Sequence, residues 1–62
     1  MPHIQITMLE GRSAEQKRKI ATRMTEVLVE EAGANRDAIT VAFVEVPRES
    51  FARGGVLISD RK

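Results

Sequence analysis

Hydrophobic and polar residues alternate in the first segment of the chain, from His3 to Leu9. Each set recurs at every second position, with Ile4, Ile6 and Met8 on one side and His3, Gln5 and Thr7 on the other. A period of two is typical of a strand with one buried face. Residues 10–12 break the alternation, so we predict that this strand ends at about Leu9.

A helical period follows the first strand. Ser13 and Gln16 form a capping-box pair, in which the serine hydroxyl accepts from the backbone three residues on and the glutamine reaches back. We predict a helix over Ala14–Ala32 that ends at Gly33, because glycine accepts the left-handed conformation of a helix end. The stripe predicted to face the core is Ile20, Met24, Val27, Leu28 and Glu31, and the face predicted to be solvated carries Lys17, Arg18, Glu26 and Glu30.

The strongest strand pattern covers residues 39–46, after a short turn at 35–38. Apolar residues occur on both of its faces, which is usual for a strand covered on each side by a helix or another subunit. Pro47 ends this strand, since proline cannot donate to a sheet ladder. Residues 51–58 contain the pair Gly54-Gly55 between apolar positions and predict a small hairpin.

These elements predict an α/β fold in which residues 1–62 form a single domain. Roughly 30 residues with one helix separate the two strands, which is the length of a right-handed crossover between parallel strands. The expected architecture is one β-α-β unit with a C-terminal hairpin. One helix covers only one face of the sheet, and a 62-residue chain is marginally stable alone. We therefore expect a second subunit to complete the sheet.

Composition narrows the possible functions. The chain has no cysteine and one histidine, so neither a disulfide framework nor a zinc site built from its side chains is expected. Ten basic and nine acidic residues give a net charge of +1, and only two residues are aromatic, so no nucleic-acid surface is expected. No apolar run has membrane-spanning length, and the first residues do not have the pattern of a signal peptide. The absence of cysteine fits a cytoplasmic location.

After these exclusions, Pro2 remains as the candidate catalytic residue. It directly follows Met1, and removal of the methionine exposes a secondary amine at the start of a predicted strand. An α-amino group titrates near ~7.7–8.0, and burial or a neighbouring cation lowers that value toward the range of a good proton shuttle. Taken alone, a Met-Pro start is more often a merely permissive N-terminus.

Arg12 and Phe51 are the candidate substrate-binding residues. A loop arginine beside a helix start is suited to a two-pronged contact with a carboxylate, although a solvated arginine is the commoner case. Phe51 lies in a polar stretch, where it either walls an apolar pocket or anchors a loop. His3 adjoins Pro2, but a lone histidine at a strand start is usually structural or solvent-facing.

Together these residues resemble the 4-oxalocrotonate tautomerase (2-hydroxymuconate tautomerase) family over essentially the whole chain. Pro2 matches the family's amino-terminal proline base, and residues 9–13 with 15–17 match its loop and helix-start motif, which contains the carboxylate-binding arginine at Arg12. Phe51 matches the family's pocket phenylalanine, and Gly54-Gly55 match its hairpin glycines. The combination is specific although each part alone is weak.

The resemblance implies an assembly and a chemistry. Two β-α-β units pair into a four-stranded sheet, and dimers commonly assemble into hexamers, as a trimer of dimers. The activity is keto–enol isomerisation of small unsaturated oxo acids of the 2-hydroxymuconate kind, from aromatic degradation, without a metal or an organic cofactor. The proline nitrogen takes the proton of the enol hydroxyl and returns it to a distant carbon, while arginines stabilise the dienolate.

Thr40 departs from the family pattern. Members that process dicarboxylates carry a second arginine at this position, and threonine cannot form a charged fork to a carboxylate. Either another arginine substitutes, with Arg53 and Arg36 as candidates, or the substrate differs. The proline mechanism also requires that Met1 is removed, since otherwise the nitrogen of Pro2 is an amide.

Two further hypotheses stay open at this level. Protonated Pro2 could act as an acid in hydration or dehalogenation of an unsaturated acid, with Glu10 or Glu45 activating water. Alternatively, the chain is a catalytically silent subunit of an oligomer that contains an active paralogue.

Overall fold

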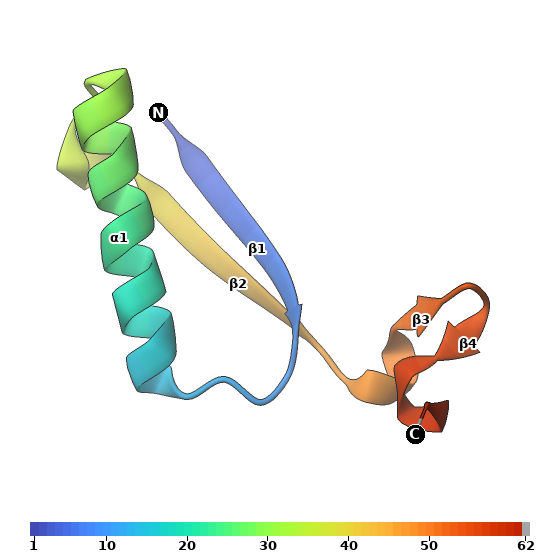
Figure 1. Ribbon diagram of the computed structural model, residues 1–62. Coiled ribbons are helices and arrows are strands. Elements are labelled where there is room, and N and C mark those ends of the chain that lie inside the picture. Colours follow the sequence, from blue (N-terminus) through green and yellow to red (C-terminus); the bar gives the residue numbers. More distant parts are fainter. Residues whose placement is uncertain (62) are drawn as a thin grey trace.

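A parallel pair of strands with one crossing helix forms the larger part of the molecule. The computed structural model describes residues 1–61. Strand β1 (His3–Leu9), helix α1 (Ala14–Ala32) and strand β2 (Thr40–Val46) follow one another, with a short 3-10 turn, η1 (Arg36–Ala38), before β2 (Figure 1). The strands β1 and β2 pair in parallel, which confirms the predicted β-α-β unit.

Local interactions set both ends of α1. The hydroxyl of Ser13 accepts from the backbone N–H of Gln16 at 3.1 Å, and Gln16 Oε1 accepts from the N–H of Ser13 at 3.0 Å. The predicted capping box and helix start are therefore confirmed. At the other end Gly33 has φ 65°, in the left-handed region that glycine adopts without steric cost.

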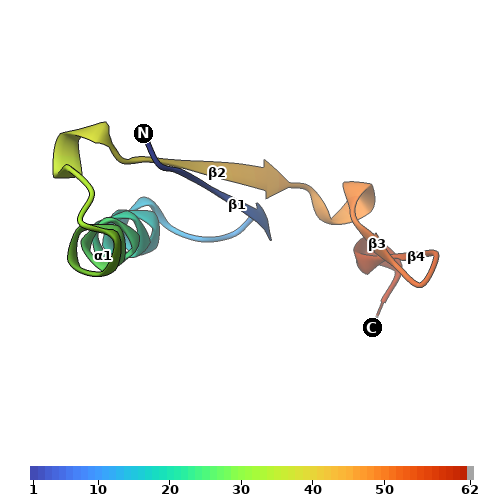
Figure 2. The same ribbon diagram turned by 90° about the horizontal axis from the view of Figure 1, so that it is seen from above.

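The orientation of α1 on the sheet differs from the prediction. The helix covers one face of the β1–β2 pair (Figure 2), but Met24 and Val27 of the predicted core stripe are 41% and 52% exposed. Lys17, which was predicted to be solvated, is half-buried and forms an ion pair with Glu45 of β2. Glu45 of β2 lies on the helix-facing side of the sheet and attracts Lys17, so Lys17 is half-buried there, while Ile20 and Leu28 of the predicted stripe are half-buried as expected. The half-buried helix positions are Lys17, Ile20, Ala21, Thr25, Leu28 and Val29.

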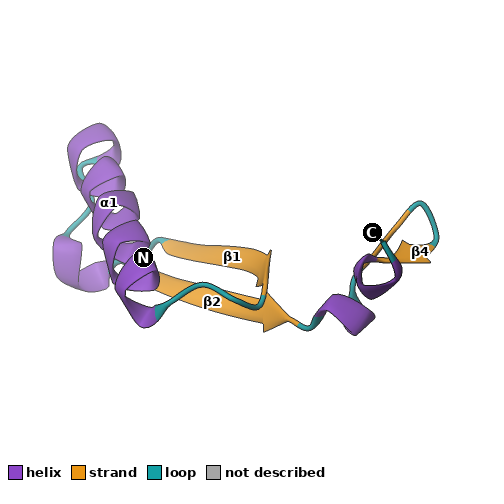
Figure 3. Ribbon diagram, turned by 60° about the horizontal axis from the view of Figure 1, so that its bottom comes forward, coloured by secondary structure: helices purple, strands orange, loops and turns teal. Residues whose placement is uncertain are grey.

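The C-terminal residues form a separate arm beyond the end of β2 (Figure 3). A 3-10 turn, η2 (Arg48–Ser50), leads into the antiparallel pair of β3 (Ala52–Arg53) and β4 (Val56–Leu57), and η3 (Ile58–Asp60) follows. The glycine pair at positions 54 and 55 makes the turn with φ of 61° and 82°. Positive φ at both central residues is the geometry of a tight hairpin turn, so the predicted hairpin is confirmed.

A single chain has no completed core. None of the described residues falls in the buried class. The molecule measures 43 × 23 × 14 Å, and its radius of gyration of 14.8 Å exceeds the roughly 11 Å of a compact domain of this length. The sheet face opposite α1 has no cover within the described residues (Figure 2). These features agree with the expectation that a second subunit completes the fold.

Candidate functional site

Pro2 lies immediately before β1, at the amino end of the parallel pair. Its carbonyl oxygen accepts a hydrogen bond from the backbone N–H of Thr40 at 3.1 Å, which ties it to the start of β2. The residue is half-buried, whereas Met1 is 96% exposed. With Met1 attached the nitrogen of Pro2 is an amide and holds no basic lone pair. The backbone around this nitrogen is thus fixed by sheet pairing while the residue in front of it projects into solvent.

A histidine–threonine pair stands beside Pro2. His3 Nδ1 lies 2.6 Å from Thr40 Oγ1, across the first rung of the β1–β2 register. Both side chains are exposed, and they alternate with the helix-facing residues Ile4 and Val41. His3 was predicted to be structural or solvent-facing, and its contact with Thr40 was not foreseen. The pair offers hydrogen-bonding groups beside Pro2.

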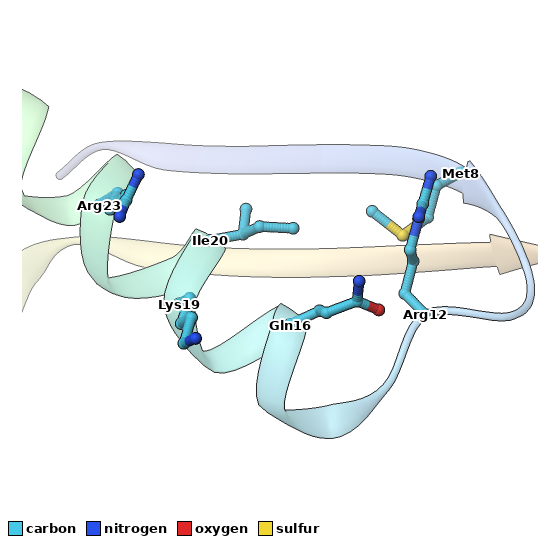
Figure 4. A pocket seen from close by; sticks show the side chains of 6 residues that line it. All are labelled: Met8, Arg12, Gln16, Lys19, Ile20 and Arg23. Atoms are coloured by element: carbon cyan, nitrogen blue, oxygen red, sulfur yellow. The ribbon is translucent and has the colours of Figure 1, made fainter.

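Arg12 lies at the opposite end of β1, in the loop that leads into α1. Gly11 before it has φ 128°, which a residue with a side chain rarely adopts, and the Ser13 cap follows it. Its side chain lines a groove of about 490 Å³ between the sheet and the helix (Figure 4). The lining residues are Met8, Arg12, Gln16, Lys19, Ile20 and Arg23. The groove therefore has an apolar floor and three cationic side chains, and its volume is in the range of small-molecule sites.

A second arginine, Arg48, shares this end of the sheet with Arg12. The two side chains line a hollow of about 370 Å³ together with Glu10 and neighbouring residues of the loop. Sequence reasoning did not select Arg48. The signal was available, because Arg12 and Arg48 each closely follow a strand, and the carboxyl ends of parallel strands meet at one edge. The backbone bond from the N–H of Glu10 to the carbonyl of Val46, at 3.1 Å, holds that edge together.

Phe51 and Arg53 belong to the C-terminal arm. Phe51 is 44% exposed, and its carbonyl accepts from the N–H of Ile58 at 2.8 Å. The carbonyl of Arg53 accepts from Arg61 Nη2 at 2.9 Å, so the contact fixes the arm and leaves the Arg53 guanidinium available. The arm extends from the carboxyl end of β2, far from Pro2 (Figure 1).

The predicted site residues are therefore not assembled within one chain. Pro2 precedes β1 and Arg12 follows it, and a strand of seven residues spans roughly 23 Å at about 3.3 Å per residue. Of the two arginines considered as substitutes at Thr40, Arg36 lies in η1 at the Pro2 end, and Arg53 lies at the far end. A small substrate cannot touch Pro2 and Arg12 of the same chain.

Metal binding and membrane insertion find no support in the described residues. Among residues 1–61, no three or more His, Cys, Asp and Glu side chains are grouped closely enough to hold a metal ion. No helix in that same part of the chain has the length and apolarity needed to cross a membrane.

Comparison with known proteins gives a consistent result over the full length. Residues 2–61 match the sequence profile of a family described as Tautomerase enzyme. A 2-hydroxymuconate tautomerase of Bacillus subtilis is 38% identical over 60 residues, covering 97% of each chain. A solved 4-oxalocrotonate tautomerase homologue superposes with a TM-score of 0.94 at 39% identity, covering 100% of this chain and 98% of the other. A heterohexamer 4-oxalocrotonate tautomerase from Chloroflexus aurantiacus gives 0.91 at 29% identity, with 100% of both chains covered.

Proposed function

This chain belongs to the tautomerase family, and we propose that it interconverts the enol and keto forms of small unsaturated 2-hydroxy and 2-oxo acids. Family membership makes the chain an enzyme of the isomerase class. The observation that carries the finer proposal is the match of residues 2–61, which begins on the proline that follows Met1. The name of the Bacillus subtilis relative supports 2-hydroxymuconate as an example of the substrate class.

Pro2 is the general base of the proposed reaction. Once Met1 is removed, its secondary amine takes the proton of the enol hydroxyl. The electron pair of that O–H bond forms the ketone, and the double bonds shift along the carbon skeleton of the substrate. The protonated amine then delivers the same proton to a distant carbon of the substrate. The proton that leaves is the proton that returns, so the reaction requires no metal, redox group or organic cofactor.

Arg12 is the proposed carboxylate-binding residue. Its guanidinium makes two parallel hydrogen bonds to a carboxylate and draws electron density toward that end of the substrate, which stabilises the dienolate. Arg48 lines the same hollow, so it adds positive charge beside this contact. Phe51 is the proposed apolar wall of the pocket and Arg53 a further substrate-binding residue, both from the arm.

The proposed site is shared between copies of the chain. Pro2 and Arg12 lie at opposite ends of β1, so the base of one copy must meet the arginine of another for both to touch one small substrate. The exposed sheet face and the absence of buried residues among positions 1–61 support such an assembly. We propose that residues 1–62 act as one domain and form a homo-oligomer, a hexamer built as a trimer of dimers. The hexameric neighbour from Chloroflexus aurantiacus supports that size.

The Thr40 side of the site is proposed to give no charged contact to a second carboxylate. Thr40 stands where dicarboxylate-processing members carry an arginine, and its partner His3 offers hydrogen bonds in place of a charged fork. Arg36 lies at this end of the sheet but belongs to the preceding turn. We therefore propose a preference for enol acids with one carboxylate, which Arg12 binds.

Hydration or dehalogenation, with Pro2 as an acid, is less well supported. That chemistry needs a carboxylate near Pro2 to activate water. Glu45 is occupied by Lys17 on the helix side of the sheet, and Glu10 lies at the Arg12 end. Only Glu10 would approach Pro2 in a site shared between copies, and the relatives compared above are named tautomerases, so this chemistry stays the second candidate.

The cellular setting forms part of the same proposal. The absence of cysteine supports a cytoplasmic location. The substrate class supports a place in the degradation of aromatic compounds.

A comparison of enol acids with one and with two carboxylates tests the proposed substrate class. The purified chain, shown by mass spectrometry to lack Met1, should convert phenylenolpyruvate with a higher kcat/KM than 2-hydroxymuconate. Thr40→Arg should raise the relative preference for the dicarboxylate about tenfold, because it adds a charged fork worth about 1.5–3 kcal/mol at most. Thr40→Val is the control, since it removes the hydroxyl without adding charge.

Two results of that comparison would count against the proposal. A wild-type preference for the dicarboxylate that Thr40→Arg leaves unchanged contradicts a site without a charged contact at Thr40. An assembled, Met1-free chain that converts neither acid supports the catalytically silent subunit instead.

A further inference from the structure

A single ion pair joins helix α1 to the sheet in the described part of the chain. Lys17 Nζ lies 2.5 Å from Glu45 Oε1, and the two side chains are 26% and 30% exposed. Among residues 1–61 no other salt bridge occurs. A partly exposed ion pair contributes little to the free energy of folding. The role of this pair therefore depends on which segments it holds in place.

The start of α1 does not itself require a lysine at this position. The helix begins at Ala14, so Lys17 is its fourth residue. The partial charges of a helix favour anions near its amino end, which makes a cation there unfavourable. The capping box already satisfies backbone groups of the first turn. The contact with β2, and not the helix start, therefore accounts for a cation at position 17.

The loop that carries Arg12 is held at both ends by two adjacent residues of β2. Where the loop leaves β1, the N–H of Glu10 donates to the carbonyl of Val46 at 3.1 Å. Where the loop has entered α1, Lys17 pairs with the carboxylate of Glu45. The capping box makes this turn of the helix continuous with the loop. The loop thus starts and ends on the same short stretch of β2.

Between these two anchors the loop has few contacts of its own. Gly11 has φ 128°, and no atom of another segment lies within 4 Å of the place where its Cβ would be. Arg12 is exposed, and it takes part in no ion pair among residues 1–61. The direction of the Arg12 side chain therefore depends on the two anchors.

The ion pair lies at the same end of the sheet as both arginines. Glu45 lies three residues before Arg48, which shares with Arg12 the hollow of about 370 Å³. Met8 lies opposite Glu45 in the parallel register, and it lines the groove beside α1 together with Arg12. Figure 4 shows Met8, Arg12 and Gln16 around one end of that groove. A shift of the first turn of α1 would therefore move the Arg12 loop relative to Arg48.

We propose that Lys17 and Glu45 are positioning residues for Arg12. Their ion pair holds the first turn of α1 against β2, which fixes the loop where the Arg12 guanidinium meets the substrate carboxylate. A small displacement of such a group lowers the rate, because two parallel hydrogen bonds tolerate little misalignment. This inference rests on the proposed function of Arg12, whereas the restraint on the loop is independent of it.

A double-mutant cycle with Arg12 distinguishes positioning from general stabilisation. In the chain without Met1, Lys17→Met should lower kcat/KM for phenylenolpyruvate roughly fivefold, which is the size expected for a partly exposed ion pair. In the Arg12→Ala background the same substitution should have almost no effect, because no guanidinium remains to be positioned. Equal losses in both backgrounds would show that the ion pair only stabilises the fold, and would overturn the proposal.

A rescue variant and a matched control complete the kinetic test. Lys17→Glu should lower kcat/KM more than Lys17→Met, because it places two carboxylates together, and the added Glu45→Lys should restore most of the activity. Arg18→Met removes a cation from the next, exposed position of α1, which does not line the hollow, and it should leave kcat/KM unchanged. Circular dichroism reports whether each variant keeps its helix. A folded double variant that is no more active than Lys17→Glu contradicts the proposal.

Hydrogen exchange tests the restraint on the loop without using activity. The amides of residues 10–13 should exchange about fivefold faster in Lys17→Met, while those of residues 4–8 keep their wild-type rates. Arg18→Met should change neither set. Unchanged exchange in residues 10–13 would refute the restraint.

The two kinds of measurement separate this inference from the proposed function. If exchange rises and Arg12→Ala lowers kcat/KM but Lys17→Met does not, the ion pair restrains the loop without positioning Arg12, and the inference fails. If Arg12→Ala itself leaves kcat/KM unchanged, the proposed function of Arg12 fails, and the inference fails with it. Faster exchange together with a loss of activity that depends on Arg12 is the result expected.

Discussion

The two ends of the parallel strand pair carry different chemistry. At the amino end, Pro2 is tied to Thr40 through its backbone, and Thr40 contacts His3. At the carboxyl end, Arg12 and Arg48 line one hollow beside the loop into α1. One end thus offers a fixed backbone nitrogen beside the His3–Thr40 contact, and the other offers two arginines. Under the proposed function, this separation by a whole strand means that one chain holds two halves of a site.

The largest expected effect is that of changing Pro2, at the amino end of the parallel strand pair. Pro2→Ala should lower kcat for enol acids by about 10²–10⁴-fold, the usual contribution of a general acid–base group. Stopped-flow absorbance of the enol measures the rate. An extra residue placed before Pro2, in a chain that is otherwise unchanged, keeps the side chain but converts the nitrogen to an amide, so it should cause a loss of similar size.

The chain with the extra residue distinguishes the role of the Pro2 nitrogen from the role of its ring. Activity retained by the extended chain would show that the free amine is not the base. Both variants should keep the oligomeric state of the wild type, because Met1 is exposed in the described structure.

Substitutions at the carboxyl end of the parallel strand pair should lower the catalytic efficiency less than substitution of Pro2, and by different amounts. Arg12→Ala should lower kcat/KM by roughly 10–100-fold, since a hydrogen bond to a charged group contributes about 1.5–3 kcal/mol. Arg48→Ala should act mainly on KM and by a few-fold, because it adds charge beside the contact without replacing it. Steady-state kinetics on one enol acid measures both.

The relative size of the losses caused by Arg12→Ala and Arg48→Ala shows which arginine binds the carboxylate. If Arg48→Ala costs more than Arg12→Ala, the hollow binds the carboxylate through the residue after β2 and not through the loop before α1. Arg18→Ala, at an exposed position of α1 that does not line this hollow, is the control and should change neither parameter.

The sequence predicted the elements well because their signals are local. The alternation from His3, the capping box at Ser13, the stop at Gly33 and the glycine pair of the hairpin each depend on residues near one another in the chain. The structure has all of these features.

The side of α1 that faces the sheet was predicted less well. Periodicity finds an apolar stripe but does not say which partner it faces, and a subunit of an oligomer has more than one. Met24 and Val27 are 41% and 52% exposed, and Lys17 forms an ion pair with Glu45 of the sheet. That pairing joins residues on different elements, which a local pattern does not reveal.

The arrangement of the site was not predicted. Family resemblance selected Pro2, Arg12 and Phe51, and Arg53 was a possible substitute for the arginine absent at Thr40. The predicted strand between Pro2 and Arg12 implies their separation, and the predicted parallel pairing implies the proximity of Arg48 to Arg12, but each consequence combines residues far apart in the sequence.

Activity of mixed inactive chains tests the shared site most directly. Pro2→Ala and Arg12→Ala chains are each purified, unfolded, mixed in equal amounts and refolded, and the turnover of an enol acid is compared with each variant refolded alone. A mixed pair holds one site with both groups intact and one site with neither, so the mixture should recover a substantial share of wild-type activity. A mixture that is no more active than the two variants alone, although native mass spectrometry finds mixed oligomers, would contradict a site shared between copies.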